Sequence, residues 1–151
     1  MGNKSDIGKK EKESLELFLS LMKSTDIISD KVAKVVREYG LSYAQFGVLE
    51  TLFHVGPLCQ KDLADKHLTT NGNITQIIDK MEYKKWVKRV KSKEDRRKFN
   101  IELTKTGSRL IESSFPDFAG HIATILNPLS SSDKKSLSKL LDKFSQTRDS
   151  K

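Results

Sequence analysis

Cysteine is nearly absent from this chain of 151 residues, because Cys59 is the only one. No disulfide can therefore form within the chain, and chains without a disulfide framework are typical of a reducing compartment. No stretch of the sequence approaches the roughly 20 apolar residues of a membrane-spanning helix. The charged N-terminal residues, up to Glu13, lack the apolar segment of a signal peptide. These absences predict a soluble, cytoplasmic protein.

The sequence also lacks the motifs that carry catalysis or hold cofactors. It contains no glycine-rich phosphate loop, no nucleophile elbow and no paired-carboxylate motif. Its three histidines, His54, His67 and His121, are far apart and do not have the spacing of metal ligands. We therefore expect no enzyme activity, no metal and no cofactor.

Positive charge is what the chain has in excess. It carries 28 Lys and Arg against 20 Asp and Glu, a formal net charge of +8. A strongly basic balance points to a polyanionic partner, such as nucleic acid or an anionic membrane. Hydrophobic residues make up 36% of the chain, enough to build a core, and the length suits one domain with or without dimerisation arms.

Apolar residues recur at helical spacing through most of the chain. Helices are predicted from Glu13 to Gly40, from a Ser42–Gln45 capping box to Gly56, over 59–66, over 71–84, from Thr104 to Pro128, and from 130–133 onward. Between the helix over 71–84 and the helix that begins at Thr104, the period changes to two. Phe99, Ile101 and Leu103 alternate with polar residues, as in a half-buried strand, and 86–91 is the predicted partner strand. Three short helices followed by a hairpin with a charged loop is the outline of a winged helix.

The predicted helix over 71–84 has one apolar face and one polar face. Ile74, Ile78 and Met81 form its apolar stripe. Asn and Gln side chains can pair with adenine edges, Lys can reach guanine or phosphate, and a Thr methyl can touch the thymine methyl. An ordinary amphipathic helix would show a similar polar face. The candidate DNA-reading residues on this helix are Asn71, Asn73, Thr75, Gln76 and Lys80.

The hairpin after this helix concentrates positive charge. From Lys80 to Lys98 the sequence has ten Lys or Arg against three acidic residues, where phosphate contacts would be needed. A solvated charged loop is the alternative interpretation. Asp95 is expected to brace the loop by pairing with an arginine. The candidate DNA contacts here are Lys88, Arg89, Lys93, Arg96, Arg97 and Lys98.

Several runs of this sequence resemble the MarR family of bacterial regulators. They are Asn73 to Glu82, Trp86 to Arg89, Asp95-Arg96-Arg97, and Leu103-Thr104-Lys105-Thr106-Gly107. The resemblance implies an obligate dimer joined by the N- and C-terminal helices and a pseudo-palindromic operator in double-stranded DNA. It implies repression as the usual action, and release by small phenolic or lipophilic ligands or by oxidants. It also implies that Arg97 enters the minor groove and that Asp95 braces the wing.

Some positions carry two interpretations or depart from the family. The family usually has Gly where this chain has Lys85, and a left-handed Lys there costs roughly 1–2 kcal/mol. Cys59 stands at a helix start, where it is either a cap and packing residue or a redox sensor, and no second cysteine is present to resolve a sulfenic acid. Tyr43, Phe46 and Phe53 are either core aromatics or the lining of a ligand pocket.

The sequence therefore predicts a mainly α protein with a small β-hairpin wing, a winged helix-turn-helix with N- and C-terminal dimerisation helices. The predicted divisions are a disordered tail over 1–12, a dimerisation helix over 13–40, a DNA-binding core over 41–107 and C-terminal dimerisation helices over 108–147. The predicted function is sequence-specific regulation of transcription, most simply as a repressor. The alternative is a winged-helix protein-assembly module that does not read DNA.

Overall fold

The structure is a computed structural model that describes residues 8–93, 95 and 97–146. Over these residues it has six helices and three short strands. The helices are α1 (Lys9–Glu38), α2 (Tyr43–Val55), α3 (Gln60–Lys66), α4 (Asn71–Tyr83), α5 (Lys105–Ile125) and α6 (Ser131–Gln146). The strands are β1 (Leu58–Cys59), β2 (Val87–Lys91) and β3 (Phe99–Leu103). The predicted class, mainly α with a small β wing, is confirmed.

The sheet has one strand more than the predicted hairpin. Its order is β1-β3-β2, and both pairings are antiparallel. Leu58 of β1 and Arg89 of β2 both lie opposite Ile101, which is buried at the centre of β3. A third strand ties the chain before α3 to the wing, so the wing is anchored at its base and does not stand alone.

The core of the molecule lies where α2, α4 and the sheet meet. The predicted stripe of α4, Ile74, Ile78 and Met81, is fully buried, as are Leu49 of α2 and Ile111 of α5. Residues 41–107, called the lobe below, therefore share one core with Val32 and Val36 of α1 and Ile111 of α5. Phe99 differs from the prediction of a half-buried strand face: its side chain is exposed, because it lies at the tip-side end of β3, beyond the reach of the helices.

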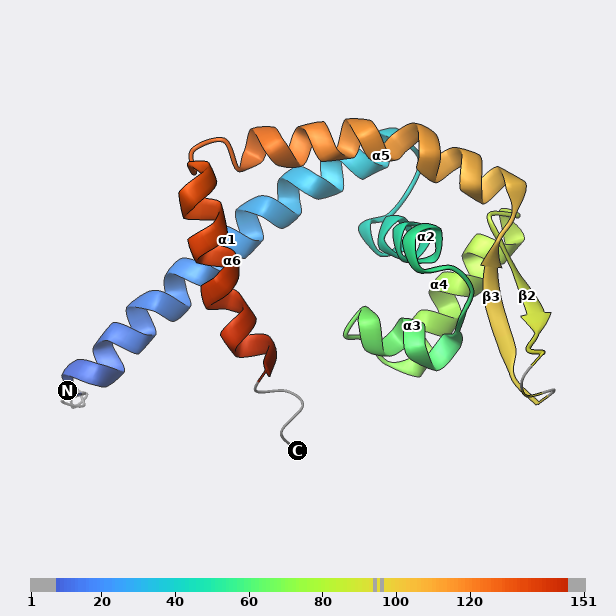
Figure 1. Cartoon of the computed structure of the whole chain (residues 1–151), viewed down its shortest axis with the longest axis horizontal. Helices are drawn as coiled ribbons and strands as arrows, with labels where there is room; N and C mark the ends of the chain where they lie inside the picture. The colour runs from blue at the N-terminus through green and yellow to red at the C-terminus, as the bar shows by residue number, and fades with distance from the viewer. Residues whose placement is uncertain (1–7, 94, 96, 147–151) are drawn as a thin grey trace, which may run out of the picture.

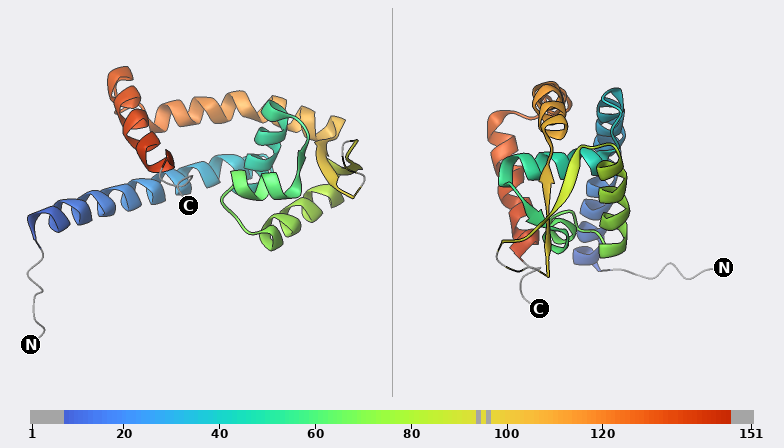
Figure 2. Two further views of the ribbon diagram at one scale, coloured as in Figure 1. Left: turned by 60° about the horizontal axis from the view of Figure 1, so that its bottom comes forward. Right: turned by 90° about the vertical axis from the view of Figure 1, so that its right-hand side faces the viewer.

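The two long helices lead away from this lobe. The C-terminal half of α1 lies along α5 and buries Val32, Val35 and Val36 (Figure 1). The N-terminal half of α1 and all of α6 project beyond the lobe, at the end of the molecule opposite the wing (Figure 1). Figure 2 shows these two arms standing apart from one another when the molecule is turned. Every residue of α1 from Lys9 to Ser20 and of α6 from Ser131 to Phe144 is exposed.

The helix α1 begins earlier than the sequence pattern indicates. The structure starts it at Lys9, after Gly8 as the N-cap, so the predicted disordered tail over 1–12 is wrong for residues 9–12. Lys and Glu are good helix formers, yet they give no apolar period by which a helix could be recognised. Residues 1–7 lie outside the described part of the chain.

Three helices end in the same way. One residue after the helix takes the left-handed conformation, and two consecutive backbone N–H groups donate to carbonyl oxygens of the last turn. The left-handed residues are Gly40 after α1, Leu68 after α3 and Lys85 after α4, with φ of 71°, 52° and 60°. After α4, Lys85 N donates to Glu82 O at 2.9 Å and Trp86 N donates to Met81 O at 2.9 Å, which is the Schellman arrangement. Lys85 thus takes the conformation that favours glycine, and the chain still turns from α4 into the wing.

Candidate nucleic-acid interface

The N-terminus of α4 is fixed by threonine side chains. Thr70 is the N-cap and its Oγ1 accepts from Asn73 N at 3.2 Å. The side-chain amide of Asn73 donates to Thr69 Oγ1 at 2.6 Å, so Asn73 supports the turn that leads into the helix. Of the predicted reading residues, Asn71, Asn73, Gln76 and Lys80 are exposed. Because the apolar stripe of α4 is buried, its polar face is exposed, as the sequence predicts.

A hydrogen-bond chain joins α3 to α4 beside this face. Gln60, the first residue of α3, donates from Nε2 to Thr75 Oγ1 at 2.5 Å, and Thr75 Oγ1 donates to Asn71 O at 2.6 Å. Thr75 is half-buried by this contact. Sequence reasoning missed Gln60, and the only available signal was a polar residue in the first turn of the helix that precedes α4.

Arg89 is the predicted DNA contact that the structure places elsewhere. Its guanidinium pairs with Asp79 at 2.5 Å and with Glu82 in a second ion pair, and its backbone N donates to Glu82 Oε1 at 3.1 Å. Burial lowers the pKa of Arg89, but the hydrogen bonds to Asp79 and Glu82 outweigh that effect and raise it. We therefore withdraw Arg89 from the set of phosphate contacts. It joins β2 to α4 and neutralises two carboxylates on the C-terminal half of α4.

The wing loop is held by Asp95. Asp95 Oδ1 accepts from Arg97 N at 3.0 Å and from Arg97 Nε at 3.3 Å, while Asp95 N donates to Ser92 Oγ at 3.4 Å. The backbone hydrogen bond from Arg97 lowers the pKa of Asp95, so its carboxylate stays charged. The side chain of Arg97 is 92% exposed. Lys93 and Lys98 are exposed too, and Arg96 lies outside the described residues.

Lys88, on the outer side of β2, pairs with Glu102 of β3. Its Nζ lies 3.5 Å from Glu102 Oε2, and more than half of the Lys88 side chain remains exposed. A pair with this exposure contributes little to stability and exchanges readily with water or another anion. Lys88 therefore keeps its place among the candidate phosphate contacts.

A tight joint connects the end of α4 to the start of α5. Thr104 Oγ1 donates to Lys85 O at 2.6 Å and accepts from Gly107 N at 3.1 Å, and Thr104 N donates to Trp86 O at 3.0 Å. A Cβ on Gly107 would lie 2.0 Å from Trp86 O, which no packed structure allows. The Leu-Thr-x-x-Gly run of the sequence is therefore a structural joint: threonine caps α5, and glycine lets it approach the wing.

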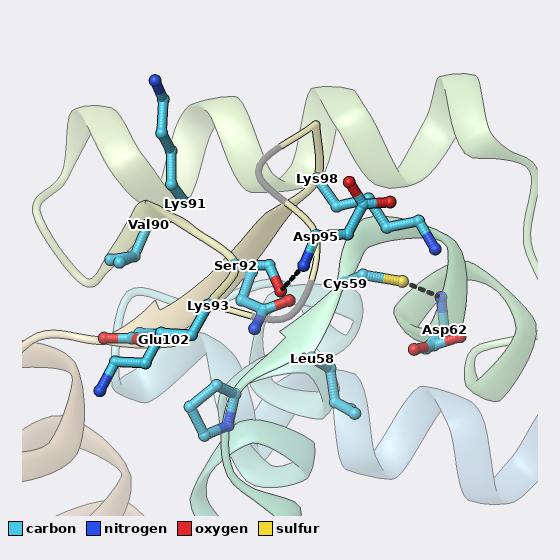
Figure 3. Close-up of a pocket in the computed structure, with 12 residues that line it drawn as sticks. Leu58, Cys59, Asp62, Val90, Lys91, Ser92, Lys93, Asp95, Lys98 and Glu102 are labelled. Atoms are coloured by element: carbon cyan, nitrogen blue, oxygen red, sulfur yellow. Dashed lines mark hydrogen bonds between the residues drawn. The ribbon is translucent and has the colours of Figure 1, made fainter.

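A polar groove of about 480 Å³ lies between the wing, including its loop, and the start of α3 (Figure 3). Cys59 and Asp62 line it on one side, Asp95 and Lys98 on the other. The Cys59 sulfur accepts from Asp62 N at 3.5 Å and Cys59 is the N-cap of α3. This is the cap arrangement that the sequence offered as one of two interpretations of Cys59.

The three predicted pocket aromatics differ in their surroundings. Phe46 is 2% exposed and its ring centroid lies 4.3 Å from that of Phe118 of α5, so it belongs to the core. Phe53 stacks edgewise on His54 with centroids 5.2 Å apart. Tyr43, 58% exposed, lines a different groove of about 390 Å³ together with Leu68. Phe46 and Phe53 stand seven residues apart, on the side of α2 that faces the aromatic rings of α5, whereas Tyr43 lies in a separate groove. A pocket lined by all three residues stays a prediction.

The described residues contain no group of His, Cys, Asp and Glu that could hold a metal ion. None of their helices is both long enough and apolar enough to cross a membrane.

Comparison with known proteins gives one consistent family. The model of the MarR family matches residues 41–99. The HTH-type transcriptional regulator MhqR of Bacillus subtilis is 33% identical over 129 residues, which span 85% of this chain and 89% of MhqR. The HTH-type transcriptional repressor YetL of the same bacterium is 34% identical over 134 residues, which span 85% of this chain and 78% of YetL.

Solved structures share the fold. A mutant MarR from Escherichia coli, complexed with operator DNA, matches this chain with a TM-score of 0.79 at 20% identity. The match covers 87% of this chain and 95% of that one. The lobe and both long helices are thus arranged as in a solved winged-helix regulator.

Proposed function

This chain belongs to the MarR family and is a DNA-binding transcriptional regulator, and we propose that it acts as a homodimeric repressor on a pseudo-palindromic operator. It is a regulator and not an enzyme. We also propose that it works in the cytoplasm, where double-stranded DNA would be its partner. The observation that carries the proposal is the exposed polar face of α4 beside a basic wing.

The proposed binding mode gives α4 and the wing different tasks. We propose that α4 enters the major groove, where Gln76 and its neighbours reach base edges, and that Arg97 at the wing enters the minor groove. Lys80, Lys88, Lys93 and Lys98 would supply phosphate contacts, which position the protein but carry no sequence information. The complex of the E. coli MarR mutant with operator DNA supports this mode, because the two chains share the fold.

The proposed dimer rests on the two arms. The exposed large apolar side chains of α1 and α6 lie on helices that the lobe does not cover, and exposed apolar surface of this kind marks an interaction site. A two-fold dimer would cover both arms at once and would present two copies of α4 to two half-sites. The apolar residues of the arms are Leu15, Leu17, Phe18, Leu19, Met22, Ile27, Leu137, Leu140, Leu141 and Phe144.

We propose that a small phenolic or lipophilic inducer releases the DNA and that it binds in the groove beside Tyr43. Leu68 and Ile77 give this groove apolar walls, and Asn73 brings it next to the DNA-facing side of α4. An occupant would therefore touch both α2 and the reading helix. Gel shifts with operator DNA and a panel of phenols test this, because Tyr43→Ala should raise the phenol concentration needed for release. Release at unchanged concentration would place the inducer elsewhere.

The main experiment distinguishes a DNA reader from a protein-assembly module. Footprinting on the DNA that flanks the chain's own gene should reveal a protected pseudo-palindrome. Gln76→Ala should then weaken binding to that site by about 1–3 kcal/mol and weaken binding to unrelated DNA much less, with little change in salt dependence. Asn127→Ala, an exposed amide at the end of α5, is the matched control and should change neither.

Two results would contradict the proposal. Absence of any protected site, together with equal binding to all duplexes, would favour the assembly module. An equal loss for Gln76→Ala on operator and unrelated DNA would mean that Gln76 supports the helix and does not read sequence.

A further inference from the structure

We propose that Thr75 reads a thymine through its methyl group, because Gln60 and Asn71 occupy its hydroxyl. The inference rests on the proposed function, in which α4 lies in the major groove. It adds a chemical identity to one base of the operator and assigns Gln60 as the residue that positions Thr75.

The hydroxyl of Thr75 is used on both sides. A threonine hydroxyl has one hydrogen to donate, and here that hydrogen goes to Asn71 O at 2.6 Å. The oxygen also accepts from Gln60 Nε2 at 2.5 Å. Thr75 therefore has no donor left for a base edge. Its oxygen already serves Gln60 and Asn71 and keeps a single lone pair, so the methyl is the group that we assign to the base contact.

The same two bonds fix where the methyl lies. In a helix, threonine divides between two side-chain rotamers, because its oxygen can bond the carbonyl one turn earlier. The bond to Asn71 selects among them, and the bond from Gln60, on a different helix, holds the choice. A methyl held in one place at the half-exposed border of α4 is preorganised for an apolar contact and loses little side-chain entropy on binding.

The major groove offers one apolar group of matching size. Thymine carries a methyl at C5, while cytosine and uracil carry hydrogen there, and the other major-groove features of the bases are hydrogen-bond donors and acceptors. A methyl without a free hydroxyl therefore favours thymine over the other bases. Gln76, the next residue along, is exposed and remains available for hydrogen bonding to a neighbouring base.

The test compares two variants that split the threonine side chain. Thr75→Val keeps a methyl at each branch and removes the hydroxyl, whereas Thr75→Ser keeps the hydroxyl and removes the methyl. The probe is a duplex that the wild-type protein selects from a random-sequence pool, in which each thymine is replaced by uracil in turn. Thermal unfolding of each variant checks that the fold is retained.

The inference predicts that uracil at one position in each half-site weakens wild-type binding about fourfold, the effect of one buried methyl group. Thr75→Val should keep that discrimination and Thr75→Ser should lose it. Gln60→Ala alone should reduce the discrimination between thymine and uracil. Added to Thr75→Ser, it should cause no further loss of discrimination. Binding to the unmodified duplex by the wild type establishes the proposed function independently.

Three outcomes would overturn the inference while leaving that function intact. The first is a selected duplex in which no thymine is sensitive to uracil. The second is full discrimination by Thr75→Ser. The third is an equal loss for both variants on all duplexes, which would mean that Thr75 only supports the helix. Failure of the wild type to select any duplex would overturn the proposed function itself.

Discussion

The DNA-binding lobe and the two arms are built from similar amphipathic helices, yet they end in opposite states. In the lobe, the stripe Ile74–Ile78–Met81 of α4 is fully buried. In the arms, the corresponding stripes are open: Leu19 of α1 is 63% exposed and Leu140 of α6 is 53% exposed. Helical periodicity identifies a face that must be covered, but it does not say which chain covers it. The faces of the lobe are covered within the same chain, with help from α1 and α5, whereas the arms are the surfaces that the proposed second copy would cover.

The largest expected effect comes from placing charge on an arm. Leu19→Glu should convert the protein from about twice the 17.1 kDa chain mass to the monomer in light scattering at micromolar concentration. A buried, unpaired carboxylate in an interface is strongly unfavourable. Operator affinity should fall at least roughly 100-fold, because the two lobes lose their linkage.

Val55→Glu is the matched control for this comparison. Val55 is 55% exposed, a fraction similar to the 63% of Leu19, but it lies at the end of α2 in the lobe. Its variant should keep the dimer mass. A wild-type protein that binds its operator as a stable monomer would end the distinction between lobe and arms.

A second expected effect lies at the joint between the two regions. Gly107→Ala should lower the free energy of unfolding by about 2–4 kcal/mol, because its Cβ meets the Trp86 carbonyl and backbone must move. Gly120→Ala, on the same helix, meets nothing within 4 Å and should raise stability by up to about 1 kcal/mol through helix propensity. Urea unfolding measures both, and equal effects at the two glycines would refute the close approach.

A smaller effect separates Arg97 from Arg89, two of the three arginines of the wing. Arg97→Ala should leave unfolding unchanged and reduce the slope of log affinity against log salt by about one, as loss of one DNA contact does. Arg89→Ala should instead lower stability by roughly 1–2 kcal/mol, because Asp79 and Glu82 lose their common partner. A salt-slope change for Arg89→Ala as large as for Arg97→Ala would restore Arg89 to the DNA contacts.

The smallest effect is expected at Cys59. Serine also caps helices, so Cys59→Ser should keep both operator binding and the response to inducer. Gel shifts with and without peroxide provide the measurement. If peroxide abolished binding by the wild type and spared the serine variant, Cys59 would be a sensor and not only a cap.

The features that could be predicted from the sequence are those set by residues close together in the chain. The capping box of Ser42 and Gln45 is present as predicted, with both hydrogen bonds formed, and Thr104 caps α5. The buried stripe of α4 follows from its own spacing. The motif runs were sufficient to identify the family. The division into a core over 41–107 and dimerisation regions stays a prediction.

The features that the sequence did not reveal depend on contacts between distant segments. β1 has two residues, too few to show a period, and it exists because β3 lies beside it. The ion pairs of Arg89 depend on how β2 packs against α4. The bond from Gln60 to Thr75 depends on the angle between α3 and α4. Tyr43, Phe46 and Phe53 are equivalent by composition, and only the packing of α2 against α5 separates the core aromatic from the exposed ones.

At Gly107, close packing and hydrogen bonds hold the start of α5 directly against the segment that follows α4. In the proposed dimer, each copy of α4 is thus closely joined to α5, the helix that leads to the second copy of the chain. Equivalent positions on DNA recur about every 34 Å, which is one helical turn. The two copies of α4 must therefore be held at about that distance to reach both half-sites. A change in the angle between the arms would change the distance between the two copies of α4, so that they could no longer enter both half-sites at once. Such a change would release the operator without altering a single base-contacting side chain.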